Sequence, residues 1–226
     1  MNAGARVDVW TVVRERFAAG DTGGFQYMRT ATRRITAGAY AVAVAGLLAA
    51  VPGTAAHAGE RVPEPRAFTS EFWVEATPDM VIDGQGNPVP GERGASGTFE
   101  FRLNSHKDVI CYDIAFTGVT PPYQSPARTA THIHQAGGGE FGPPRLAFPD
   151  PRDDGRGTLR SSGCMQGPFT TGLTGPDGND TGAGFTVAQI EDDPSSFYAD
   201  THTAAFPAGA IRGQLVDADR GYAKPW

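Results

Sequence analysis

Three histidines and one aspartate occupy positions from which they could share a metal ion. His132 and His134 are separated by one residue, so on a strand they point to the same face and Ile133 points to the other. His202 lies in a second strand-like run, and Asp200, two residues earlier, shares its face. Imidazole nitrogen binds copper, zinc, iron and nickel. We predict that the fold brings these histidines together as a metal site, with Asp200 as a fourth ligand or as an orienting hydrogen-bond partner.

The identity of the metal follows from which ligands are available. The predicted site contains no thiolate, and three imidazoles with an open position suit copper, which proteins meet outside the cytoplasm. Copper is therefore favoured over zinc as the cofactor. The alternative is that one or more of the three histidines form structural hydrogen bonds at the rim of the fold and that no metal binds.

The elements that must position these residues are short strands. Alternating apolar residues and frequent turn signals predict about seven strands and almost no helix. The seven predicted strands are 68–76, 98–103, 108–116, 128–135, 158–165, 197–203 and 210–216. A further short strand could form at 145–148, and one or two helical turns at 187–192. Strands 98–103 and 108–116 are separated by a short connection and predict a hairpin. The predicted class is all-β, an antiparallel sandwich or barrel.

The first 58 residues carry the pattern of an export signal. Basic residues follow Met28, the apolar run 37–51 comes next, and Ala56-His57-Ala58 has the small-x-small form of a cleavage site. We read 28–58 as a signal peptide and 1–27 as an upstream extension from a misplaced start codon. The predicted mature chain has an N-terminal arm (59–67), one domain (68–216) and a C-terminal tail (217–226). A transmembrane span is not expected after cleavage, because the apolar run is shorter than the roughly 20 residues that a span needs.

The charge of the mature chain argues against two classes of partner. Cleavage after Ala58 leaves 13 basic and 22 acidic residues, a net charge of −9. An acidic domain without a basic patch is a poor candidate for binding nucleic acid or an anionic membrane. A secreted, periplasmic or cell-surface location is expected, with an unidentified protein or matrix component as partner.

Four further residues are singled out by type and position. Cys111 and Cys164 are the two cysteines of the chain, and an even pair in an exported protein predicts a disulfide. Arg212 alternates away from Ile211 and Leu215. It is predicted to be a structural arginine that bridges the sandwich; binding an anion, or pairing with Asp200 or Glu140, is the alternative. Gly213 is expected to permit a close backbone approach or a bulge.

Several segments, in this order, resemble the CHRD domain, a module named from chordin and found in many bacterial secreted proteins. They are A-T-H-I-H (130–134), the glycines of 137–142, S-G-C (162–164), F-Y-A-D-T-H-T (197–203) and F-P-A-G-A-I-R-G-Q-L (206–215). The resemblance extends from Phe68 to Val216. Asp200 departs from it, because the family more often has an amide or another polar residue before the final His-Thr.

The resemblance implies a β-sandwich of immunoglobulin-like shape, with kinship to copper–zinc superoxide dismutases. Those enzymes also use an H-x-H strand to hold copper, but they need further histidines and a zinc-binding aspartate. The mature chain has only His106 besides the three discussed above, so dismutase activity is not carried over. The leading hypothesis is a non-catalytic module that binds a metal or a partner. A dismutase-like redox enzyme and an adhesive or matrix module with structural histidines are the two alternatives.

Overall fold

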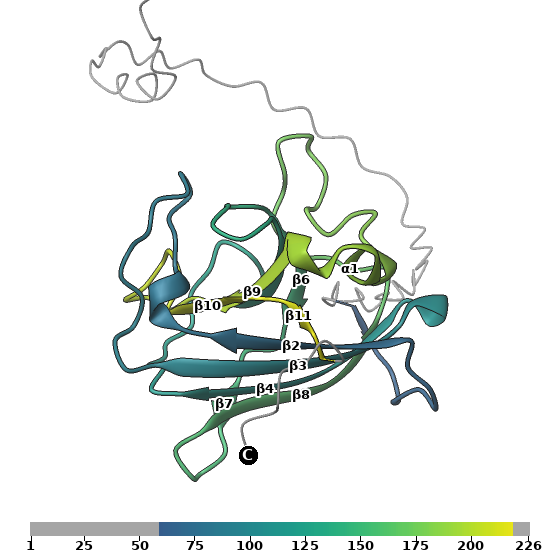
Figure 1. Cartoon of the computed structure of the whole chain (residues 1–226), viewed down its shortest axis with the longest axis horizontal. Coiled ribbons are helices and arrows are strands. Elements are labelled where there is room, and N and C mark those ends of the chain that lie inside the picture. The colour runs from purple at the N-terminus through teal and green to yellow at the C-terminus, as the bar shows by residue number, and fades with distance from the viewer. Residues whose placement is uncertain (1–58, 219–226) are drawn as a thin grey trace, which may run out of the picture. The chain divides into compact units, whose positions relative to one another are not determined.

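The computed structural model describes residues 59–218, which form two antiparallel sheets stacked as a sandwich (Figure 1). The larger sheet has the order β1-β8-β4-β3-β2-β11, with β7 also paired to β8, and the smaller has the order β10-β9-β5-β6. The all-β prediction is confirmed. The predicted signal peptide and upstream extension lie outside the described residues.

The strands agree closely with the alternating runs of the sequence. The larger sheet contains β1 (Glu60–Arg61), β2 (Ser70–Ala76), β3 (Ser96–Asn104), β4 (Val109–Thr117), β7 (Arg152–Asp153), β8 (Leu159–Gln166) and β11 (Val216–Asp217). The smaller contains β5 (Thr131–Gln135), β6 (Pro144–Phe148), β9 (Phe197–Thr201) and β10 (Ile211–Gln214). The helix α1 (Ala188–Asp192) and three 3-10 turns (Pro78–Met80, Ser105–Lys107, Pro194–Ser196) complete the described elements. No helix among them is long and apolar enough to cross a membrane.

Two short strands were not expected from the sequence. β1 belongs to the predicted N-terminal arm, and β7 lies between two predicted strands, 145–148 and 158–165. Both are two residues long and exposed, and both pair with the same edge of β8. Two residues are too few to establish an alternating pattern, which explains why periodicity did not reveal them.

The core fills the space between the sheets and is rich in aromatic side chains. Phe99 and Phe116 meet edge to face with ring centroids 5.3 Å apart, and Phe101 stacks on Phe148 from the other sheet at 5.4 Å. The predicted hairpin is present as β3 and β4, with Ser96 opposite Thr117 at the end farthest from the turn. One face of β5 therefore points into the core, where Ile133 is fully buried. Its other face points to the outer side of the smaller sheet and is not part of the core between the sheets.

The predicted disulfide is present on the opposite face of the larger sheet. Cys111 and Cys164 lie directly across from each other on β4 and β8 and are bonded, with a Cα–Cα distance of 4.0 Å. Val62 and Phe68 pack against the bonded pair. The chain before β2 therefore lies over the disulfide.

Gly213 is a position where the two sheets approach each other closely. A Cβ atom at this position of β10 would lie 2.2 Å from the carbonyl oxygen of Glu75 on β2 and 2.7 Å from a methyl group of Val74. Because the nearest atom belongs to backbone, it cannot swing away. This contact agrees with the close backbone approach expected from the sequence.

A Gly213→Ala variant is expected to be less stable by roughly 2–3 kcal/mol, because the sheets must separate to admit the methyl group. Urea denaturation monitored by tryptophan fluorescence measures the change. Gly138→Ala is the matched control, since a Cβ there meets nothing within 4 Å. Equal stability of the two variants would contradict the close approach.

Candidate metal centre

Strand register places the predicted ligands side by side on the outer face of the smaller sheet. β5 pairs antiparallel with β9, so that His132 lies opposite Asp200 and His134 lies opposite Tyr198. His202 follows the end of β9, and its backbone N–H still donates to the carbonyl of Ala130 at 2.9 Å. Because side chains alternate, His132, His134 and Asp200 share the face opposite Ile133. The sequence prediction for this face is thus confirmed by the register.

Each imidazole is oriented by a backbone carbonyl. His132 Nε2 lies 2.6 Å from the carbonyl oxygen of Thr129, and His134 Nδ1 lies 2.8 Å from that of Gly142. His202 Nδ1 lies 3.1 Å from the carbonyl oxygen of Pro207. A carbonyl oxygen only accepts hydrogen bonds. These three nitrogens therefore carry the protons, and in each neutral ring the other nitrogen bears a lone pair.

The three remaining nitrogens converge on the carboxylate of Asp200. His132 Nδ1 and His134 Nε2 lie 3.7 and 3.2 Å from Asp200 Oδ1, and His202 Nε2 lies 3.3 Å from Oδ2. Lone pairs of neutral rings and carboxylate oxygens are all acceptors. They repel one another unless a proton or a metal cation lies between them.

Because these groups are buried, their arrangement is energetically unfavourable when no cation lies between them. The exposed fractions of His132, His134 and Asp200 are 1, 4 and 4%. His132 Nδ1, His134 Nε2 and Asp200 Oδ1 are buried and have no hydrogen-bond partner within the described chain. A buried polar atom left without a partner costs about 1–3 kcal/mol. Three such atoms facing one point indicate that a charged species completes the site.

The pKa values of these side chains reflect two opposing effects, burial and the interaction with neighbouring side chains in the cluster. Burial alone would raise the pKa of Asp200, but the surrounding imidazoles lower it well below its usual value. Burial lowers the pKa of His132 despite the nearby carboxylate. For His202 the outcome is reversed, since Asp200 outweighs burial and raises its pKa. The carboxylate is thus ionised, and His132 is neutral, as a metal ligand must be.

The dimensions of the cluster suit a transition metal. One candidate ligand atom from each of His132, His134, Asp200 and His202 lies within 4.8 Å of the others. A tetrahedral ion with bonds of about 2.0–2.1 Å needs its ligands roughly 3.3 Å apart, so small side-chain adjustments would close the cluster. Within residues 59–218 no other group of three or more histidine, cysteine or carboxylate side chains has this geometry.

Tyr198 and Arg212 form a stack behind the ligands. The Tyr198 ring lies parallel to His134 with centroids 4.7 Å apart, and the Arg212 guanidinium lies 3.5 Å from the centroid of the tyrosine ring. Arg212 also donates to the carbonyl of Glu140 at 2.6 Å. Its observed contacts are structural: it fixes the loop after β5 and stacks on Tyr198. They lie on the outer face of the smaller sheet and not across the sandwich, where the sequence analysis had placed the bridge. The contact with Glu140 is made by the backbone and not by the carboxylate.

Gly142 shows why the loop after β5 needs its glycines. A Cβ atom at this position would lie 2.0 Å from the carbonyl oxygen of Gln135. Only glycine lets the loop press against the end of β5, where its carbonyl meets His134. The sequence analysis noted the glycines of this loop and the segment that contains Tyr198 only as part of the family resemblance, and it assigned neither of them a role. The spacing of Tyr198, Asp200 and His202 was the signal that all three share one side of the strand.

The comparisons with known proteins agree with the sequence resemblance. The family model described as "CHRD domain" matches residues 80–215, which include all four clustered side chains and both cysteines. Neither the curated proteins nor the solved structures gave a significant match. With the match covering more than half of its length and the whole candidate site, the chain belongs to the CHRD domain family.

Proposed function

We propose that this protein is an exported, non-catalytic metal-binding module. A single divalent transition metal would be held by His132, His134, His202 and Asp200. The metal would fix the outer face of the smaller sheet and the loops that cover it, which form the surface available to a partner. An extracytoplasmic location is supported by the disulfide, because such bonds persist in oxidising compartments.

The observation that carries the proposal is the direction of the imidazole lone pairs. The carbonyls of Thr129, Gly142 and Pro207 hold the three rings so that their free nitrogens face one carboxylate. Neutral structural histidines would instead place a donor N–H against Asp200. Metal-binding histidines commonly donate their second N–H to a carbonyl or carboxylate in this way.

The same geometry bears on the choice between zinc and copper. The preference for copper assumed an open coordination position, whereas Asp200 supplies a fourth ligand and the cluster is buried. A closed set of four protein ligands is typical of structural zinc, and zinc accepts both histidine nitrogen and carboxylate oxygen. Cu²⁺ binds most nitrogen and oxygen sites more tightly than Zn²⁺. We therefore propose zinc as the metal that the geometry suits, with copper as its competitor.

We propose a structural rather than a catalytic role because the four ligands leave no open position at which a substrate could reach the metal. A catalytic zinc keeps three protein ligands and one open position for water or substrate. Here four side chains converge, and His202 is the most exposed with 13% of its side chain accessible. A dismutase-like reaction would require superoxide to reach the metal past these ligands, and no observation on the described residues favours that alternative.

Metal titration of the purified protein tests the proposal. After treatment with a chelator, the protein is expected to bind one equivalent of Zn²⁺ or Cu²⁺ in calorimetry and to melt at a higher temperature when loaded. His202→Ala is expected to weaken binding by about a hundredfold or more, since it removes a direct ligand. His106→Ala, which alters a histidine outside the cluster, should bind like the wild type. Absence of binding by the wild type would overturn the proposal and leave the histidines with a structural role.

A further inference from the structure

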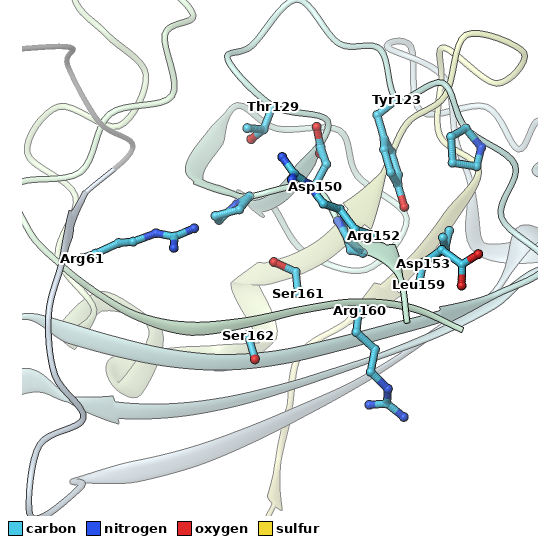
Figure 2. Close-up of a pocket in the computed structure, with 13 residues that line it drawn as sticks. Arg61, Tyr123, Thr129, Asp150, Arg152, Asp153, Leu159, Arg160, Ser161 and Ser162 are labelled. Atoms are coloured by element: carbon cyan, nitrogen blue, oxygen red, sulfur yellow. The ribbon is translucent and has the colours of Figure 1, made fainter. Parts of the chain in front are cut away.

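A cleft of about 880 Å³ opens beside β8, and none of the four candidate metal ligands lines it (Figure 2). Its walls come from the edge of β8, the loop that precedes β5 and the loop that joins β6 to β7. The apolar part of the lining is formed by Pro121, Pro149, Pro151 and Leu159. A cleft of this volume lies in the range of known ligand sites.

The floor of the cleft offers hydroxyl donors without partners. The hydroxyl groups of Tyr123 and Thr129 are buried and make no hydrogen bond within the described residues. Figure 2 shows Tyr123 directed into the cleft. Burial raises the pKa of Tyr123, so this hydroxyl stays protonated and is able to donate. An unsatisfied buried hydroxyl is costly, and a ligand that supplies an acceptor would remove that cost.

Two guanidinium groups project toward the same space. Arg61 on β1 and Arg152 on β7 both line the cleft, whereas the Arg160 side chain turns away from the other lining residues (Figure 2). Arg160 pairs instead with Asp154 at 3.4 Å. Arg61 and Arg152 place two positive charges along the cleft in a chain of net charge −6, and guanidinium groups pair well with carboxylates.

The acidic residues that line the cleft are already engaged. Asp150 accepts hydrogen bonds from the backbone N–H of Ala130 at 2.8 Å and from the Thr131 hydroxyl at 3.1 Å. Asp153 accepts from the N–H of Gly155 at 2.7 Å. These contacts engage one oxygen, Oδ1, of each carboxylate. The two arginines and the unpartnered hydroxyls of Tyr123 and Thr129 are the donors of the lining, and the ligand that complements them is rich in acceptors.

The edge of β8 adds a backbone site between the two arginines. β1 pairs with Met165 and Gln166, and β7 pairs with Leu159 and Arg160. Ser162 lies between them without a strand partner on this side among the described strands. Val62 donates to the Cys164 carbonyl and Asp154 donates to the Thr158 carbonyl. By the alternation of the ladder, the N–H and C=O of Ser162 face the same edge.

We propose that this cleft binds an extended acidic peptide segment of a partner protein. One residue of the peptide would pair with the backbone of Ser162, and its carboxylates would meet Arg61 and Arg152. The positions opposite these arginines on β8, Met165 and Arg160, are five residues apart, about 17 Å along a strand. A stretch of roughly five extended residues spans that distance. Addition of a strand to an exposed sheet edge is a known mode of peptide recognition.

Amide-resolved NMR of the purified protein tests the proposal with two peptides. One is acetyl-Gly-Asp-Ala-Asp-Gly-amide, and the other has Asn in place of both Asp. Saturable shifts at the Thr129, Ser161 and Ser162 amides are expected with the Asp peptide and not with the Asn peptide. The double variant Arg61→Gln/Arg152→Gln should weaken binding by about tenfold or more. Arg156→Gln is the control, because Arg156 is an exposed arginine of the neighbouring turn outside the cleft lining.

Three results would overturn the proposal. The first is the absence of saturable shifts with the Asp peptide. The second is equal binding by the double variant and by Arg156→Gln. The third is binding of sodium succinate as tight as that of the Asp peptide, which would make the cleft a site for small acids. Because Arg61 and Arg152 are exposed, both variants should fold, and none of these results depends on whether the metal centre is loaded.

Discussion

An Asp200→Asn variant is expected to bind Zn²⁺ or Cu²⁺ at least a thousandfold more weakly than the wild type, a loss of about 4 kcal/mol or more. The carboxylate is the one anion among the four clustered side chains. Without it, a dication would be buried among three neutral imidazoles with its whole charge uncompensated, which is strongly unfavourable in a site of low dielectric constant. Asparagine has nearly the same shape, so the change tests charge rather than packing.

The metal-free variant should also lose a pH dependence that the wild type has. Asp200 raises the pKa of His202 in the folded protein. A base whose pKa is raised on folding stabilises the fold below its unfolded pKa, about 6.5, and this contribution disappears as the pH rises through the folded pKa. Burial lowers the pKa of His132, so that ring is neutral in both states above about pH 6.5 and contributes nothing in this range. Metal-free wild type should therefore become less stable above that pH, and Asp200→Asn should not.

Denaturant unfolding between about pH 6 and 8.5 in the presence of a chelator measures this difference, and calorimetry at pH 7.5 measures metal affinity. Asp113→Asn is the matched control, because Asp113 is an exposed carboxylate on β4 of the other sheet. Metal affinity equal to that of the wild type would show that Asp200 is not a ligand. The same pH dependence in both proteins would show that Asp200 does not control His202.

The part of this site that the sequence revealed depends on strand periodicity. The spacing of His132 and His134, and that of Asp200 and His202, places each pair on one face because strand side chains alternate. The family resemblance added that the two strands belong to one domain. Their adjacency in the structure follows from the pairing of β5 with β9, a long-range contact that alternation within a strand cannot specify.

Other parts of the site left no readable pattern in the sequence. The groups that orient the imidazoles are backbone carbonyls of Thr129, Gly142 and Pro207, and every residue has such a carbonyl. The tautomers, and with them the direction of the lone pairs, are set by loop conformation. The cleft was missed for a related reason: Arg61 and Arg152 lie in two-residue strands, and the sequence gives no sign that both meet the edge of β8.

The second large effect concerns the disulfide. Replacing both Cys111 and Cys164 by alanine is expected to destabilise the domain by about 4 kcal/mol, the chain-entropy value for the sequence separation of 53 residues between the bonded cysteines. For a domain of this size the melting temperature should fall by roughly 8–16 °C. The main effect is on the unfolded chain, which gains freedom when the loop is opened.

Because of where the disulfide lies, its removal should lower the stability of the domain without changing metal affinity. The bond joins neighbouring strands of the larger sheet, while the four candidate ligands lie on the smaller sheet and share no side-chain contact with it. The closed loop does contain β5, so the histidine strand is restrained in the unfolded chain but not reshaped in the folded one. Below its melting temperature, the double alanine variant should therefore bind metal with the affinity of the wild type.

Thermal unfolding of the wild type, the double alanine variant and the reduced wild type distinguishes the contributions. The two proteins without the bond should melt at similar temperatures. The apolar side chains that pack with Cys111 and Cys164 are those of Val109, Val62 and Phe68, and the change to alanine removes little of this packing. A destabilisation below about 1 kcal/mol would contradict the chain-entropy account. A loss of metal affinity in the folded variant would instead mean that the two sheets are coupled, since the restraint on the loop would then be needed to hold β5 against β9.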